Sequence, residues 1–165
     1  MFKSDLIRIY AKTNIGGFYN INRLFTQCLD IEYHELWTYA QTGDIDKCKQ
    51  FLSVNNINES DKQKILKIVV FNDHLELLKY FIQLWDIDPD TFYIQRYEDG
   101  RLLKLEHYYT LSWIASFSGS IESLKYLIEI KADIKKQYND ENIDEYESPL
   151  CIAQMNNQTE ILKLV

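Results

Sequence analysis

Apolar residues recur at helical spacing in several short segments of this chain. In 119–134, GSIESLKYLIEIKADI, the residues Ile121, Leu124 and Ile128 fall on one side of a helical wheel, which predicts a helix with one buried face. Three other segments share its Lys at the seventh position, followed by large apolar residues: GDIDKCKQFL from Gly43, DHLELLKYFI from Asp73 and NQTEILKLV from Asn157. The chain is therefore predicted to contain four related amphipathic helices.

A shorter apolar segment precedes each of these four helices. The segments are ELWTYAQT before Gly43, ILKIVVFN before Asp73, LSWIASFS before Gly119 and PLCIAQMN before Asn157. Small and apolar residues lie close together in them, which is typical of a short helix that contacts neighbours on more than one side. The repeating unit is therefore predicted to be a helix, a tight turn and a second helix.

The turn position carries the strongest signal for this repeat. It holds Gly43, Asp73, Gly119 and Asn157, and these three residue types enter the left-handed backbone region most readily. Four unrelated loops would not place them at the same register, so we interpret the repeat as real and expect positive φ at each turn. The uneven intervals between the turns fit a unit of about 33 residues with insertions.

At this level the chain resembles the ankyrin-repeat family. The resemblance is carried by SPLCIAQMNNQTEILKLV (148–165), which is close to that family's Thr-Pro-Leu-His…Gly-His pattern, and by TLSWIASFSGSIESLKYLIEIKADI (110–134). It covers roughly 34–165, with the first two units divergent, and the family's His position is taken by Trp37, Lys67, Trp113 and Cys151. The resemblance implies an all-α fold, a solenoid of stacked helix-turn-helix units joined by finger loops. The expected units are 34–58, 59–88, 105–134 and 145–165.

The remaining segments are expected to cap or interrupt this array. Residues 1–33 are predicted to form an atypical helical cap on its N-terminal end. An insertion covers 89–109, in which Asp99-Gly100 is a turn signal that predicts a β-hairpin over about 91–106. The acidic segment 135–149 is interpreted as a solvated loop, with a contact surface for a basic partner as the alternative.

The fourth unit reaches Val165 inside its second helix, and its last residues are apolar. A stack that ends in this way leaves an apolar face open. We expect that further repeats or another chain cover this end, and we favour a fragment of a longer array.

Composition limits the class of protein. The chain has 165 residues, 46% of them hydrophobic, and its net charge of −7 argues against a sequence-independent nucleic-acid partner. It has no apolar run long enough to span a membrane, and its three cysteines are spaced irregularly. These features favour a single-domain protein of the cytoplasm, or of the host-cell cytosol if its source is viral or bacterial, that binds neither nucleic acid nor membranes.

Candidate catalytic chemistry is sparse in the sequence. The three histidines, His34, His74 and His107, fall in different units, and no Cys-x-x-Cys pair or glycine-rich phosphate loop is present. His74 follows a turn residue, where a structural role is favoured. We therefore expect no catalytic residue, no metal site and no cofactor.

The resemblance implies that a protein partner contacts the finger tips and the residues just before each turn. The predicted contact residues are Tyr33, Gln41, Thr42, Gln63, Phe71, Asn72, His107, Tyr109, Phe117, Ser118, Glu145, Glu147, Met155 and Asn156. Phe71, Tyr109, Phe117 and Met155 are the favoured hot spots, because aromatic residues and Met are enriched at interface cores. The alternative is that the hairpin folds back and buries Phe71 and Phe117.

The sequence therefore favours a non-catalytic module that presents a rigid, concave repeat surface to a protein partner. Two alternatives stay open at this point. The array could target a larger enzyme or effector whose catalytic part lies outside this chain, or it could serve as a structural spacer.

Overall fold

The computed structural model describes residues 34–98, 104–137, 148–156 and 158–164. The predicted cap at 1–33, the Asp99-Gly100 turn, most of the acidic loop and the turn residue Asn157 lie outside this described part. The described residues are predominantly helical, as an all-α fold requires, and they include one β-hairpin.

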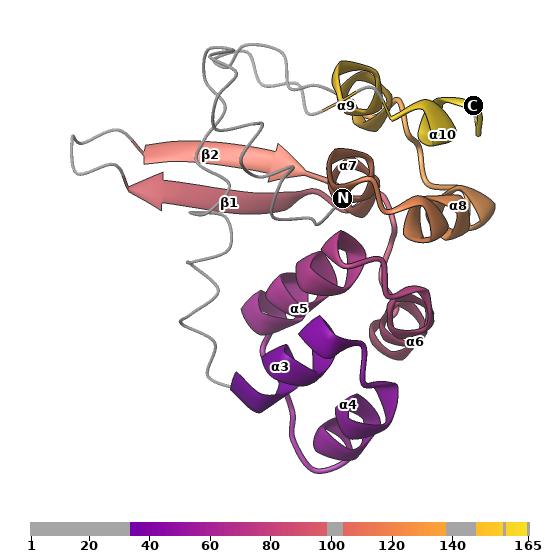
Figure 1. Ribbon diagram of the computed structural model, residues 1–165. Coiled ribbons are helices and arrows are strands. Elements are labelled where there is room, and N and C mark those ends of the chain that lie inside the picture. Colours follow the sequence, from indigo (N-terminus) through magenta and orange to yellow (C-terminus); the bar gives the residue numbers. More distant parts are fainter. Residues whose placement is uncertain (1–33, 99–103, 138–147, 157, 165) are drawn as a thin grey trace.

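The helices follow one another in pairs (Figure 1). The pairs are α3 (His34–Thr42) with α4 (Ile45–Leu52), α5 (Glu59–Phe71) with α6 (Leu75–Trp85), α7 (Leu111–Ser118) with α8 (Ile121–Glu129), and α9 (Pro149–Met155) with α10 (Thr159–Leu162). Several first helices begin at a residue whose side chain accepts a backbone N–H of the first turn, as Asn58, Thr110 and Ser148 do.

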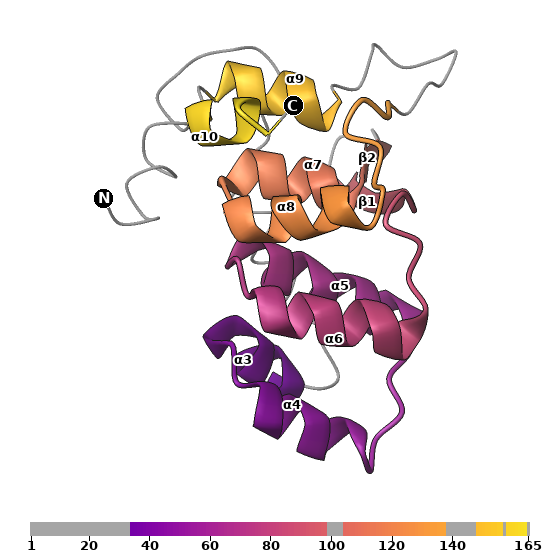
Figure 2. The same cartoon turned by 90° about the vertical axis from the view of Figure 1, so that its right-hand side faces the viewer.

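The pairs stack in sequence order to form two layers. The first helices α3, α5, α7 and α9 lie side by side in one layer, and the second helices form the other (Figures 1 and 2). The core fills the space between them, with fully buried side chains such as Leu66, Phe81 and Leu127. The C-terminal ends of the first helices therefore lie along one edge of their layer.

Positive φ at the turns is confirmed wherever the turn is described. The φ angles are 77° at Gly43, 59° at Asp73 and 72° at Gly119. A Cβ added to Gly43 would lie 2.9 Å from His74 Nδ1, so this turn also lacks room for a side chain. Lys131, after α8, also has positive φ (70°), and its residue type did not predict it.

The predicted hairpin is confirmed, but its second strand is longer than expected. β1 (Tyr93–Glu98) and β2 (Lys104–Tyr109) pair antiparallel, with Tyr93 opposite Tyr109. These two tyrosine rings stack with centroids 5.8 Å apart, and this contact stabilises the base of the hairpin. The next residue after β2, Thr110, is the N-cap of α7. The hairpin projects from the first-helix layer on the side away from α8 (Figure 1).

Candidate protein-binding surface

Most of the predicted contact residues lie at the C-terminal ends of the four first helices. They form two-residue pairs that share one register: Gln41-Thr42 on α3, Phe71-Asn72 on α5, Phe117-Ser118 on α7 and Met155-Asn156 on α9. Because these helices stack in a layer, the pairs form a row across one end of it. The two members of each pair have different environments.

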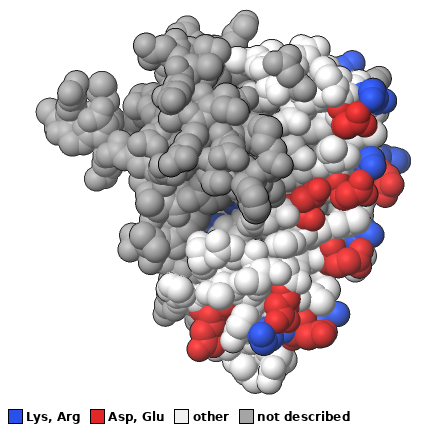
Figure 3. Space-filling model, in the orientation of Figure 1, with Lys and Arg blue, Asp and Glu red and all other residues white. Residues whose placement is uncertain are grey.

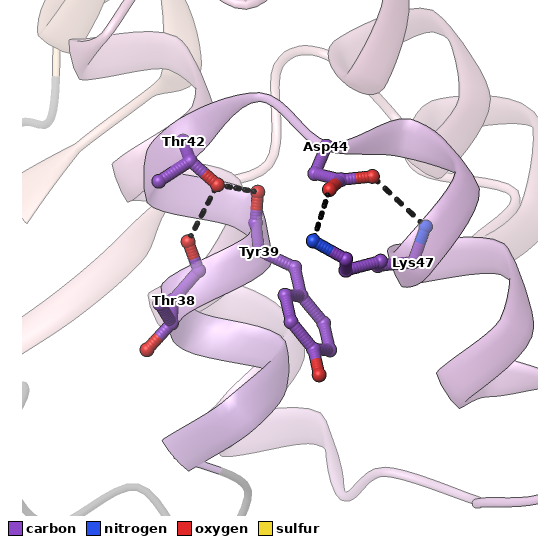
Figure 4. Close-up of polar contacts among 5 residues, drawn as sticks. All are labelled: Thr38, Tyr39, Thr42, Asp44 and Lys47. Atoms are coloured by element: carbon purple, nitrogen blue, oxygen red, sulfur yellow. Dashed lines mark hydrogen bonds and ion pairs between the residues drawn. The ribbon is translucent and has the colours of Figure 1, made fainter.

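The second residue of each pair is tied to backbone carbonyl groups. Thr42 Oγ1 donates to the carbonyl oxygens of Thr38 (3.0 Å) and Tyr39 (3.2 Å), as Figure 4 shows. Equivalent contacts join Asn72 Nδ2 to Ile68 O (2.9 Å) and Ser118 Oγ to Ile114 O (2.8 Å). These side chains satisfy carbonyl groups near helix ends, where intrahelical donors run out. The hydrogen-bonding groups of these side chains are therefore already used within the repeat, which leaves them less free to bind a partner.

In the first three pairs, the first residue joins its unit to the next through its backbone carbonyl group. His74 Nε2 donates to Gln41 O (2.9 Å), Ser120 Oγ to Phe71 O (3.3 Å) and Asn156 Nδ2 to Phe117 O (3.4 Å). The same carbonyl position is thus used at all three boundaries between neighbouring units. These joints fix the backbone beneath the row, and the structural role predicted for His74 agrees with its contact.

The side chains of these first residues remain at the surface to different degrees. We call Gln41, Phe71, Phe117 and Met155 the pre-turn row. Gln41 is exposed and Met155 is 40% exposed, whereas Phe71 and Phe117 are half-buried. Phe117 stacks on Trp113 with ring centroids 5.2 Å apart and planes 6° apart. The row therefore includes two half-buried aromatic side chains, of which Phe117 is held by its stack on Trp113.

Tyr109 was wrongly predicted to be an exposed contact residue. Its side chain is only 6% exposed and belongs to the core. Its ring stacks on Tyr93, and Lys67 Nζ lies 4.9 Å from the ring centroid. Because β2 continues through Tyr109, this residue lies at the base of the hairpin instead of at a finger tip.

The other predicted contact residues do not add to the row. Gln63 is half-buried in α5, and His107 lies on β2 opposite Gln95 in the strand pairing. Tyr33, Glu145 and Glu147 lie outside the described residues. Trp37 and Trp113 are half-buried and pack against the core, as the sequence favoured.

Charged side chains gather on the second helices. Ion pairs join Glu76 to Lys79 (3.1 Å), Glu122 to Lys125 (2.7 Å) and Glu160 to Lys163 (2.7 Å) at one register of α6, α8 and α10. Lys79 Nζ also lies 5.7 Å from the ring centroid of Tyr126 in the following unit. Figure 3 shows these charges along the side formed by the second helices.

The described residues contain no group of three or more His, Cys, Asp or Glu side chains placed to hold a metal ion. Within this part of the chain, no helix combines the length and apolar character needed to cross a bilayer. No model of a known protein family matches the chain, and comparison with curated protein sequences finds no match.

The two described cysteines should differ sharply in reactivity. Cys48 is fully buried, and desolvation, with a smaller contribution from the Asp44 charge, raises the pKa of its thiol to about 12, whereas Cys151 is half-buried. In a Cys28→Ser variant at neutral pH, an aromatic disulfide reagent should modify Cys48 at least about 100-fold more slowly than Cys151, because an opening free energy of about 3 kcal/mol gives that factor. Equal rates in the native protein would contradict the burial of Cys48, and unfolding in urea should equalise them.

Proposed function

We propose that this chain is a non-catalytic, cytoplasmic module of ankyrin-like repeats that binds a protein partner through its pre-turn row. The paired helices, the left-handed turns and the regular joints between units support the ankyrin-like interpretation. Stacked repeats of this kind bind along extended surfaces instead of in closed pockets. The partner would then lie across several units at once.

The observation that carries this proposal is that the pre-turn positions bond to the next unit through their backbone while some of their side chains face solvent. The carbonyl groups of Gln41, Phe71 and Phe117 accept hydrogen bonds from the next unit, and the side chains of Gln41 and Met155 are exposed. A row on a fixed backbone loses little conformational entropy when a partner binds. Met and aromatic side chains are also enriched where interfaces are most deeply buried. The row therefore combines a hydrogen-bonded backbone with side-chain types that are common at interfaces.

The proposal is tested by affinity capture from the cytosol of the source cells with a Gln41→Ala, Met155→Ala double variant. Truncation of hot-spot side chains removes about 2 kcal/mol or more in total, so partner recovery should fall at least about tenfold. Leu84→Ala is the matched control, because Leu84 is 48% exposed but lies on α6 in the other layer. It should capture the same proteins as wild type.

Circular dichroism must show that the double variant melts within a few degrees of wild type, as expected for two exposed side chains. Equal recovery of every enriched protein by the double variant and by wild type would refute the pre-turn row as the contact surface.

A further inference from the structure

The helix turns that carry the pre-turn row contain no charged residues. The described last turns of the first helices, 39–42, 68–71, 115–118 and 152–155, contain no Asp, Glu, Lys or Arg, although charged residues make up 26% of the chain. The ion pairs of α6, α8 and α10 lie in the other layer (Figure 3). Charge is therefore absent from the last turns of the first helices, although α5 carries the Glu59–Lys62 and Asp61–Lys64 ion pairs nearer its start.

The charged groups nearest to the row in sequence are engaged elsewhere. The Asp73 carboxylate accepts hydrogen bonds from Ser123 N (2.8 Å) and Glu122 N (3.4 Å) at the start of α8. Lys67 lies one helical turn before Phe71, but it is only 7% exposed. Asp44 forms an ion pair with Lys47 (2.8 Å; Figure 4). Both side chains of this pair are solvent-accessible, but their opposite charges already offset each other.

We infer that the partner presents an uncharged, apolar peptide segment to this row, and that its affinity is nearly independent of salt. This inference rests on the proposed function and specifies its partner. A charged residue buried against the row would lose its hydration without gaining an opposite charge, which is strongly unfavourable. Phe117, stacked on Trp113, and the flexible Met155 instead favour aliphatic and aromatic partners.

The test is selection of a displayed library of random peptides on the full chain, followed by fluorescence anisotropy with the best synthetic peptide. The enriched sequences should be apolar at their common positions and near neutral in net charge. At mildly alkaline pH, the dissociation constant should change by less than about threefold between about 0.01 M and 1 M salt, over which the screening length falls from about 30 Å to about 3 Å. Enriched peptides rich in Lys, Arg, Asp or Glu, with affinity that falls more than about tenfold over this range, would overturn the inference.

Two lysine substitutions place the peptide on one layer or the other. Met155→Lys should weaken binding at least about tenfold, because it puts a charge into the apolar contact. Leu84→Lys, at a similarly exposed position of α6, should leave the affinity unchanged. The inference is wrong if the neutral peptide binds Met155→Lys as well as wild type, or if wild type forms a dimer that Met155→Lys abolishes.

The same experiment separates this inference from the proposed function. If charged peptides bind wild type but not Met155→Lys, the inferred apolar partner is refuted, but the row remains the binding surface. If no peptide is enriched, and wild type and the double variant capture the same proteins, both the inference and the proposed function are refuted.

Discussion

Phe81→Ala should lower the free energy of unfolding by about 3–5 kcal/mol, the range measured for truncation of buried aromatic residues. Phe81 is fully buried in α6 and stacks on Trp85, with centroids 4.5 Å apart and planes 2° apart. Because α5 and α6 lie between neighbouring pairs, this cavity would also weaken the joints on both sides. The measurement is urea unfolding followed by circular dichroism.

Leu84→Ala on the same helix is the control for this prediction. Its side chain is 48% exposed, so its removal should change the unfolding free energy by less than about 1 kcal/mol. If Phe81→Ala and Leu84→Ala proved equally stable, α6 could not pack against its neighbours with the face described here.

Substitutions of Asp73 should rank in stability as Asn, Gly and Ala, with Ala the least stable. Asp73 has φ of 59°, and its carboxylate caps the start of α8 in the next unit. Asn keeps an acceptor and tolerates left-handed backbone, so it should cost less than about 1 kcal/mol. Gly keeps the backbone but removes the cap, at about 1 kcal/mol. Ala neither tolerates the left-handed backbone nor caps α8, so it should lower the free energy of unfolding by about 2–3 kcal/mol.

Asp86 provides a matched control for the Asp73 series. It also has left-handed backbone, with φ of 49°, but within the described residues its carboxylate makes no hydrogen bond. Asp86→Gly should therefore leave stability unchanged or raise it by up to about 1 kcal/mol, because it relieves backbone strain without removing a cap. If Asp73→Gly raised the stability as well, the Asp73 cap would contribute nothing to the joint.

The paired helices and their turns were predictable because local physics restricts them. A chain reversal with positive φ selects Gly, Asn or Asp, so Gly43, Asp73 and Gly119 reveal the repeat in the sequence. The cap made by Asp73 was not predictable in this way. Its carboxylate bonds to Ser123, fifty residues later, and no local pattern reports such a contact.

The candidate surface was predictable in its position but not in its composition. The repeat register placed the predicted contact residues in pairs before each turn, but Asn72 and Ser118 donate their side-chain hydrogen bonds to their own helices. The same register assigned Tyr109 to a finger tip, whereas the extended β2 strand carries it into the core. An insertion changes the neighbours of a residue without changing its place in the repeat, and this difference is invisible in the sequence alone.

Methyl NMR of Met155 tests the central claim, that a protein partner binds on the pre-turn row, most directly. The chain has only two methionines, Met1 and Met155, so methyl labelling of Met gives a spectrum that Met155→Ala assigns. On titration with a captured partner or a selected peptide, the Met155 signal should shift and saturate at the concentration at which anisotropy reports binding. Saturable binding that leaves the Met155 signal unmoved, with unchanged affinity in the Gln41→Ala, Met155→Ala variant, would place the partner elsewhere.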